Sequence, residues 1–164
     1  MYSAASRLGA GMVDWDAALV GCRLFHTSGI SFGLATHSGY THNYLLAAFE
    51  DAIKSKPEDC LVGLDYNYRS TLWSPEQARE TMTPILVDHV DLLITSIEDM
   101  ARIYGMDCGQ YSAKQIVDGD IGHIEDDDIR GFAEEAHRRF NTKIVAITIR
   151  YPDTDAKPPG SVYV

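Results

Sequence analysis

Short apolar runs that alternate with segments of helical spacing constrain the fold of this chain most strongly. The runs are centred on Leu24, Val62, Leu93 and Val145. The run around Val62 is almost continuously apolar, which is typical of a strand covered on both faces. Strands that alternate with helices in this way form parallel βαβ units with right-handed crossovers. The pattern predicts an α/β fold: a three-layer, Rossmann-like, mainly parallel sheet with helices on both faces.

Segments with helical spacing precede or separate these strands. The clearest helix start is Ser74-Pro75-Glu76-Gln77, because Ser74 can cap, Pro75 suits the first helical position and Gln77 can complete a capping box. A turn at Pro158-Pro159-Gly160 is predicted to lead into a further short strand at the end of the chain. The predicted helices are 14–19, 40–53, 74–86, a segment that ends at Gly105, and 129–140.

The charge balance limits the kinds of partner. The 164 residues include 24 Asp and Glu against 14 Lys and Arg, a formal net charge of −10. This acidity disfavours nucleic acid and anionic membrane as partners, because both need a basic surface. It does not exclude an anionic small-molecule ligand, because one or two arginines are enough to bind one. No apolar stretch approaches the ~20 residues of a membrane span. Length and composition predict one domain, of unknown oligomeric state.

Three cysteines bear on the compartment. Cys22, Cys60 and Cys108 are widely spaced and cannot all pair within one chain. A reduced, cytoplasmic location is the simplest interpretation.

An acidic segment at 118–128 holds six carboxylates and no Lys or Arg. It does not keep the register of oxygen ligands, central glycine and distal glutamate that a calcium loop requires. It is predicted to be a solvated loop with an aspartate that caps the following helix.

Three polar segments directly follow predicted strands. They are Asp65–Arg69, Thr95–Asp99 and Thr148–Arg150. In a parallel sheet, ligands bind beyond the carboxyl ends of the strands. Two arginines among hydroxyl, amide and carboxylate groups suit a phosphate-bearing ligand, because a guanidinium can clamp oxygens in a planar fork.

Each segment also has a structural explanation. Asp65 and Asn67 can end a strand by bonding their own backbone, and Ser96 with Asp99 can form a capping pair. The remaining structural alternatives are packing for Tyr66 and Tyr68, a surface position for Arg150, and an ion pair of Arg69 with Glu76 or Asp65.

Several nucleotide and catalytic signatures are missing from the sequence. There is no P-loop, no Gly-x-Gly-x-x-Gly after a strand, no Gly-x-Ser-x-Gly elbow and no paired-cysteine motif. The residues alone therefore indicate an α/β domain with a candidate anion site.

Two blocks of sequence carry a resemblance to a known family. Leu24–Ile30, and Asp65–Arg69 with Leu72–Pro75 after it, resemble sugar kinases of the ribokinase (PfkB) family, and most of all its 2-keto-3-deoxygluconate kinases (2-dehydro-3-deoxygluconokinases). That subgroup carries Asp-x-Asn-x-Arg, then Leu-Trp-Ser, and later a strand that ends in Thr-Leu-Arg. The last reads Thr148-Ile149-Arg150 here. The resemblance extends over nearly the whole chain and is most specific from Asp65 to Pro75.

The resemblance implies transfer of the ATP γ-phosphate to a hydroxyl of a keto-acid sugar, assisted by Mg²⁺. It implies nucleotide contacts for Asn67, Tyr68 and Arg69, and a substrate contact for Arg69. Thr148 and Arg150 would flank the nucleotide. The Asn-x-x-Glu motif of the family aligns with Ser96–Asp99, which departs from it, so Glu98 and Asp99 are only weak metal candidates.

Other parts of the family pattern are absent from residues 1–164. They are the N-terminal lid region and the late Gly-Ala-Gly-Asp motif, whose Asp is the general base and whose amides form the anion hole. The chain is therefore expected to be the central part of a ribokinase-like domain and to be inactive by itself. The alternatives are a non-enzymatic remnant or interaction module with weak nucleotide binding, and an α/β domain with an unrelated ligand.

Overall fold

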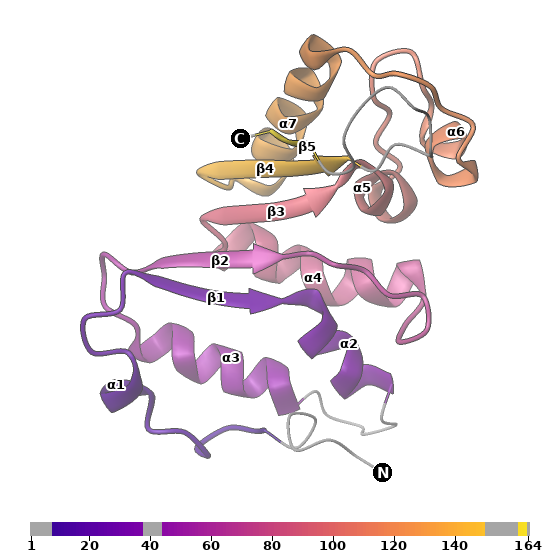
Figure 1. Ribbon diagram of the computed structural model, residues 1–164. Helices are drawn as coiled ribbons and strands as arrows, with labels where there is room; N and C mark the ends of the chain where they lie inside the picture. The colour runs from indigo at the N-terminus through magenta and orange to yellow at the C-terminus, as the bar shows by residue number, and fades with distance from the viewer. Residues whose placement is uncertain (1–7, 38–43, 150–160, 164) are drawn as a thin grey trace.

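The computed structural model describes residues 8–37, 44–149 and 161–163, which form a five-stranded sheet with helices packed against it (Figure 1). The strand order is β1-β2-β3-β4-β5. The first four strands are parallel, and β5 pairs antiparallel with β4. The strands are β1 (Leu24–Ser28), β2 (Leu61–Asp65), β3 (Leu92–Ser96), β4 (Ile144–Ile149) and β5 (Ser161–Tyr163). The α/β class and the mainly parallel sheet are thus confirmed.

The helices agree with the sequence pattern in part. Ser74 and Gln77 form the predicted capping box, and α5 ends at Gly105 in the left-handed conformation. The pattern missed α2 and α6, and the predicted turn at Pro158–Gly160 lies outside the described residues. The helices are α1 (Trp15–Ala18), α2 (Gly29–His37), α3 (Tyr44–Ser55), α4 (Pro75–His89), α5 (Ile97–Tyr104), α6 (Ala113–Asp118) and α7 (Asp126–Phe140).

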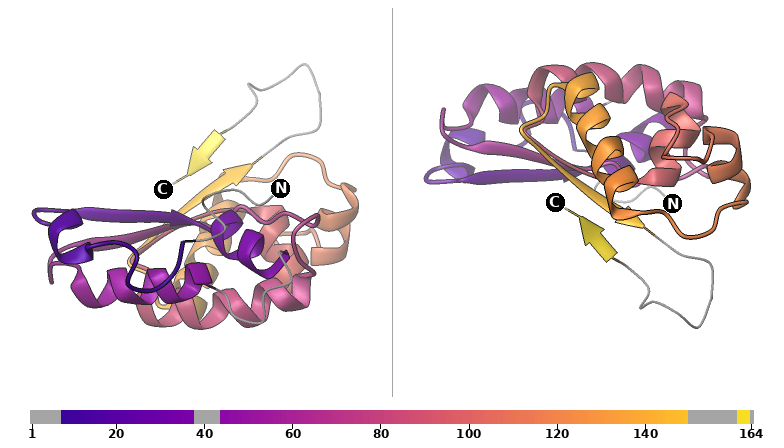
Figure 2. Two further views of the ribbon diagram at one scale, coloured as in Figure 1. Left: turned by 90° about the horizontal axis from the view of Figure 1, so that it is seen from below. Right: turned by 90° about the horizontal axis from the view of Figure 1, so that it is seen from above.

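The described helices form one layer on one face of the sheet. Because β1 to β4 are neighbours in sequence order, right-handed crossovers place every connecting helix on the same side. Helix α2 packs against α3 and α4, and α4 packs against α5 and α7. Figure 2 shows the sheet and the helices as two layers. The expected helices on the second face are therefore not found among the described residues.

The uncovered side of the sheet is called the open face below. Phe25 packs against Trp15 and Phe49 of the helical layer, so the alternation of side chains along β1 turns Leu24 the other way. Leu24 is 46% exposed and Ile144 39% exposed. Strand register assigns these residues to the open face: Leu24, His26, Leu61, Leu92, Ile94 and Ile144.

The core lies between the sheet and the helices. Val62, Leu64 and Leu93 of the central strands are fully buried there, against Met82 and Leu86 of α4. Side chains of α4 thus share one core with β2 and β3. Because β2 and β3 are parallel neighbours, the residues that follow these two strands emerge at the same edge of the sheet.

The acidic segment ends in α7 but does not cap it as predicted. The N-cap residue is Glu125, and its side chain makes no capping hydrogen bond. The first turn of α7 contains Asp126, Asp127 and Asp128, and its last turn contains three cationic or ionisable residues. This distribution of charge suits the helix dipole. In the described segments no helix is long and apolar enough to cross a bilayer.

Candidate functional site

The carboxyl ends of the parallel strands bring together the segments that the sequence singled out. Strand register pairs Ser28 with Asp65, and Ser96 with Thr148. The Thr148 hydroxyl donates to the Thr95 carbonyl at 3.2 Å, which ties the end of β4 to the end of β3. Arg150 lies outside the described residues.

The loop after β2 leaves the sheet through a tight bend. The Tyr66 N–H still bonds to the Ile94 carbonyl at 2.8 Å, but Asn67 has a φ of 43°. Asparagine tolerates this left-handed conformation better than most residues. The Tyr68 N–H then donates to Asp99 Oδ2 at 3.1 Å. The bend therefore places Asn67 and Arg69 beyond the sheet edge, with Asp99 holding the backbone between them.

Ser96 and Asp99, which the sequence suggested as a capping pair, have different roles in the structure. The Ser96 hydroxyl caps α5 by accepting from the Asp99 N–H at 3.0 Å, so the capping alternative is confirmed for Ser96. The Asp99 carboxylate instead reaches across to the loop after β2. The contact links the ends of β2 and β3 through one side chain.

Burial shapes the electrostatics of this edge. It raises the pKa of Asp99 to about 6, against the opposing effect of the Tyr68 N–H, and the Glu98 charge adds to the rise. Burial also raises the pKa of Asp65, although the charges of His26 and Arg69 oppose that rise. A nearby cation would therefore stabilise the ionised forms of these carboxylates.

Arg69 supplies a positive charge that remains accessible. The side chain is exposed, and its Nη1 donates to the Tyr68 carbonyl at 2.8 Å. With the residues that the structure describes it forms no ion pair within 4.0 Å, so the proposed pairs with Glu76 or Asp65 are not formed. Its guanidinium is therefore open to an incoming anion.

The two tyrosines of the loop serve mainly as packing. The Tyr66 hydroxyl donates to the Tyr104 hydroxyl at 3.4 Å, and the Tyr68 hydroxyl donates to the Trp73 carbonyl at 3.0 Å. Both rings are buried, which agrees with the packing alternative. A ligand at this edge would meet the backbone of Tyr68 and not its ring.

The end of β1 contributes a part of this edge that the sequence reasoning missed. A Cβ on Gly29 would lie 2.0 Å from the Tyr66 carbonyl oxygen, so only glycine permits α2 to start so close to the β2 loop. The signal was available, because Ser28 and Gly29 directly follow a predicted strand. The position of His26 near Asp65 could not be foreseen, because it depends on which strands are neighbours.

The acidic side chains suit only one mode of metal binding. The described part of the chain holds no group of three or more His, Cys, Asp or Glu side chains that could bind a metal. A cage made by the protein alone is therefore not formed there. Mg²⁺ that bridges substrate phosphates needs only one or two carboxylates, and Glu98 and Asp99 on the first turn of α5 can provide these.

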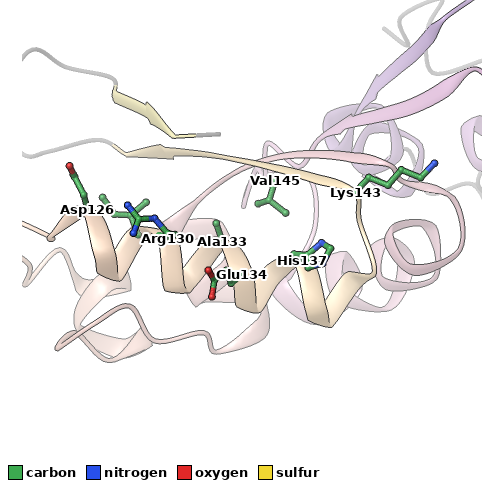
Figure 3. A pocket seen from close by; sticks show the side chains of 8 residues that line it. Asp126, Arg130, Ala133, Glu134, His137, Lys143 and Val145 are labelled. Atoms are coloured by element: carbon green, nitrogen blue, oxygen red, sulfur yellow. The ribbon is translucent and has the colours of Figure 1, made fainter.

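A separate hollow lies along α7, away from the β2 loop. It has a volume of about 370 Å³, and in Figure 3 the α7 side chains and Val145 of β4 line it, with Lys143 at one end. Its lining mixes both signs of charge with apolar groups. The lining residues are Asp126, Ile129, Arg130, Ala133, Glu134, His137, Lys143 and Val145.

The parallel sheet, its layer of crossover helices and the polar edge define an α/β domain of the ribokinase-like kind. No family model matches the sequence. The structural neighbours of the chain are carbohydrate kinases of the PfkB (ribokinase) family, as the sequence resemblance indicated.

One neighbour is 2-dehydro-3-deoxygluconokinase from Thermotoga maritima, with 32% identity and a TM-score of 0.69. The match covers 90% of this chain but only 39% of that kinase. A PfkB family carbohydrate kinase from Listeria grayi matches with 21% identity and a TM-score of 0.59, over 88% of this chain and 38% of its own. The chain thus spans well under half the length of these kinases.

Proposed function

We propose that this chain is the central portion of a carbohydrate kinase that transfers the ATP γ-phosphate to 2-keto-3-deoxygluconate or a related sugar acid. The 32% identity to a 2-dehydro-3-deoxygluconokinase over 90% of the chain carries this proposal. A neighbour from Escherichia coli assigned as ribokinase II, with 17% identity, was solved with ATP and Mg²⁺ bound, which supports these two cofactors. The proposal includes a cytoplasmic location, where ATP is available.

In this proposal Arg69 binds the substrate and the nucleotide phosphates. Its exposed guanidinium is fixed at one nitrogen by the Tyr68 carbonyl, so its other donors can meet two anionic oxygens at once. Asn67 and the backbone of Tyr68 would lie beside the phosphates. Thr148 and Arg150 would flank the nucleotide from the end of β4.

Glu98 and Asp99 are the candidates to hold Mg²⁺, which would supply positive charge against the negative charge that develops during transfer. Asp99 has a second role that needs no metal, since its carboxylate fixes the loop that carries Arg69.

We expect the isolated chain to have no kinase turnover. The Gly-Ala-Gly-Asp motif that the family resemblance calls for is absent from the sequence. General-base help is worth ~10²–10⁴-fold and an anion hole a further ~10²–10³-fold. ATP-dependent phosphorylation of 2-keto-3-deoxygluconate by the purified chain would contradict this expectation.

A chimeric kinase tests the function itself. This chain would replace the matched segment of the Thermotoga maritima enzyme, and phosphorylation of 2-keto-3-deoxygluconate would be measured. Activity supports the kinase proposal. A folded but inactive chimera, together with weak ATP binding by the isolated chain, would favour the non-enzymatic alternative.

Arg69→Ala in the active chimera should lower kcat/KM by roughly 30- to 5,000-fold, the scale of losing one member of a buried charge pair. Arg69→Lys should recover only part of this, because it loses the bidentate geometry. Arg138→Ala, an exposed arginine on α7, is the matched control and should change little. If Arg69→Ala lowered only thermal stability, Arg69 would be a structural residue.

A further inference from the structure

The parallel pairing of β1 and β2 brings two cysteines together at the amino ends of these strands. The Leu61 N–H bonds to the Arg23 carbonyl at 3.0 Å, so the ladder extends to the residue that follows Cys22. Cys22 and Cys60 therefore directly precede two residues, Arg23 and Leu61, that are hydrogen-bonded neighbours on adjacent segments. A disulfide spans Cα separations of ~4.4–6.8 Å.

The two thiols lie close enough to influence each other. Burial raises the pKa of the Cys60 thiol, and the neighbouring Cys22 thiol adds to that rise. Cys60 is buried, at 1% exposure, and its Sγ also lies 3.6 Å from the Leu61 carbonyl oxygen. Cys22 is half-buried, so a reagent in solution meets Cys22 first.

Cys108 provides an internal comparison. It is buried, and its Sγ contacts the Asp128 carbonyl at 3.7 Å. Burial and the Asp128 charge raise the pKa of its thiol to about 11, which disfavours the reactive thiolate. Cys60 is equally buried, so Cys108 differs from the pair in lacking a second, partly exposed thiol beside it.

Metal binding does not explain the pair. A structural zinc site needs four ligands, and in residues 8–37, 44–149 and 161–163 no third His, Cys, Asp or Glu completes a metal-binding group with these thiols. Two adjacent thiols can instead undergo thiol–disulfide exchange with an added disulfide, which accepts the two electrons.

We propose that Cys22 and Cys60 form a reversible intrachain disulfide when the protein meets a small-molecule disulfide oxidant. The Cys22 thiolate attacks one oxidant sulfur, forms a mixed disulfide and releases one oxidant thiolate. The Cys60 thiolate then attacks Cys22 Sγ and releases the second. The protein loses two electrons, and the oxidant is reduced to two thiols that take up the two cysteine protons.

The bond would join the starts of β1 and β2, at the opposite end of the sheet from Arg69. It encloses the chain from residue 22 to residue 60 and removes freedom from the unfolded state. We therefore expect it to raise the melting temperature, on the order of 5–10 °C, without acting on the candidate ligand site.

The test uses the full chain incubated with oxidised glutathione, then alkylated and peptide-mapped by mass spectrometry. We expect a monomer with a Cys22–Cys60 bond, an alkylated Cys108 and full reversal by dithiothreitol. Cys108→Ser should behave like the unaltered chain, whereas Cys22→Ser and Cys60→Ser should each form no intrachain bond.

The same oxidation, carried out in guanidinium chloride, measures how the three cysteines pair in the unfolded chain. The three pairs of cysteines are separated by 38, 48 and 86 residues in the sequence. For an unfolded chain, loop-closure statistics then predict that about half of the disulfide bonds include Cys108. The proposal would be overturned if all three thiols remained free in native buffer or if disulfides formed only between chains. It would also be overturned if the cysteines paired in the same proportions in native buffer as in denaturant.

Discussion

At the scale of single residues, two carboxylates at opposite ends of the sheet have pKa values that are shifted in opposite directions. Burial raises the pKa of Asp99 to about 6. Burial opposes ionisation of Asp91 too, but the Lys143 ammonium at 2.8 Å and the Val62 N–H at 2.8 Å outweigh it and lower the pKa of Asp91. Asp91 therefore stabilises the fold in its ionised form, whereas ionisation of Asp99 lowers the stability of the fold.

Asp99→Asn tests this difference through pH. Because the folded pKa of Asp99 lies above its unfolded value, its contribution to stability is present at low pH and is lost as pH rises through about 6. The free energy of unfolding of the unaltered chain, minus that of Asp99→Asn, should therefore rise by about 2 kcal/mol between roughly pH 7.5 and pH 4.5. Urea unfolding at both pH values measures it.

Asp91→Asn is the matched control, since its expected sign is opposite. Its folded pKa is lowered, so the stability that Asp91 contributes is present at neutral pH and is lost as pH falls through the folded pKa. An Asp99→Asn difference that did not change with pH, or that followed the sign of Asp91→Asn, would show that Asp99 is not buried as described.

At the scale of elements, α4 and α6 begin with the same capping box. Ser74 with Gln77 and Ser112 with Gln115 each satisfy two backbone N–H groups. Helix α4 has 15 residues and buries four side chains, whereas α6 has six residues and buries only Ile116. Losing a cap thus matters to the whole fold in α4 and mainly to local fraying in α6.

Ser74→Ala should lower the free energy of unfolding by about 1 kcal/mol. Ser112→Ala removes the same hydrogen bond, but its cost cannot exceed the free energy of local opening of α6, so a smaller loss is expected. Chemical denaturation measures both, and hydrogen exchange reports the local opening. An equal loss for the two variants would place α6 within the cooperative core.

These two helices also show what the sequence could and could not predict. Ser74 was recognised from the Pro75 and Gln77 that follow it, together with the apolar stripe of the helix. The same Ser-x-x-Gln pattern at Ser112 was overlooked, because only Ile116 is buried there and no stripe appears. The Arg69 loop was predicted from its place after a strand. The Asp99–Tyr68 contact was not, because it joins residues 31 positions apart and depends on strand order.

At the scale of the whole molecule, strand order decides which surface is left uncovered. Sequence reasoning identified the parallel strands but not their succession β1-β2-β3-β4, and this succession puts the described helices on one side. Leu24 and Ile144 are therefore exposed on the open face. In kinases of which this chain matches 39% or less, additional chain is available to cover the corresponding surface.

The isolated chain should accordingly bind a hydrophobic dye such as ANS through its open face, since contiguous exposed apolar surface is what such dyes detect. Leu24→Thr combined with Ile144→Thr should reduce ANS fluorescence in native buffer with little loss of stability, because these residues are already partly exposed and threonine suits a strand. Leu93→Thr, at a fully buried position on the helical side of β3, should instead cost about 2–4 kcal/mol. ANS fluorescence measured beside urea unfolding separates the two effects. Unchanged dye binding in the double variant, or a stability loss like that of Leu93→Thr, would mean that Leu24 and Ile144 are covered in the folded chain.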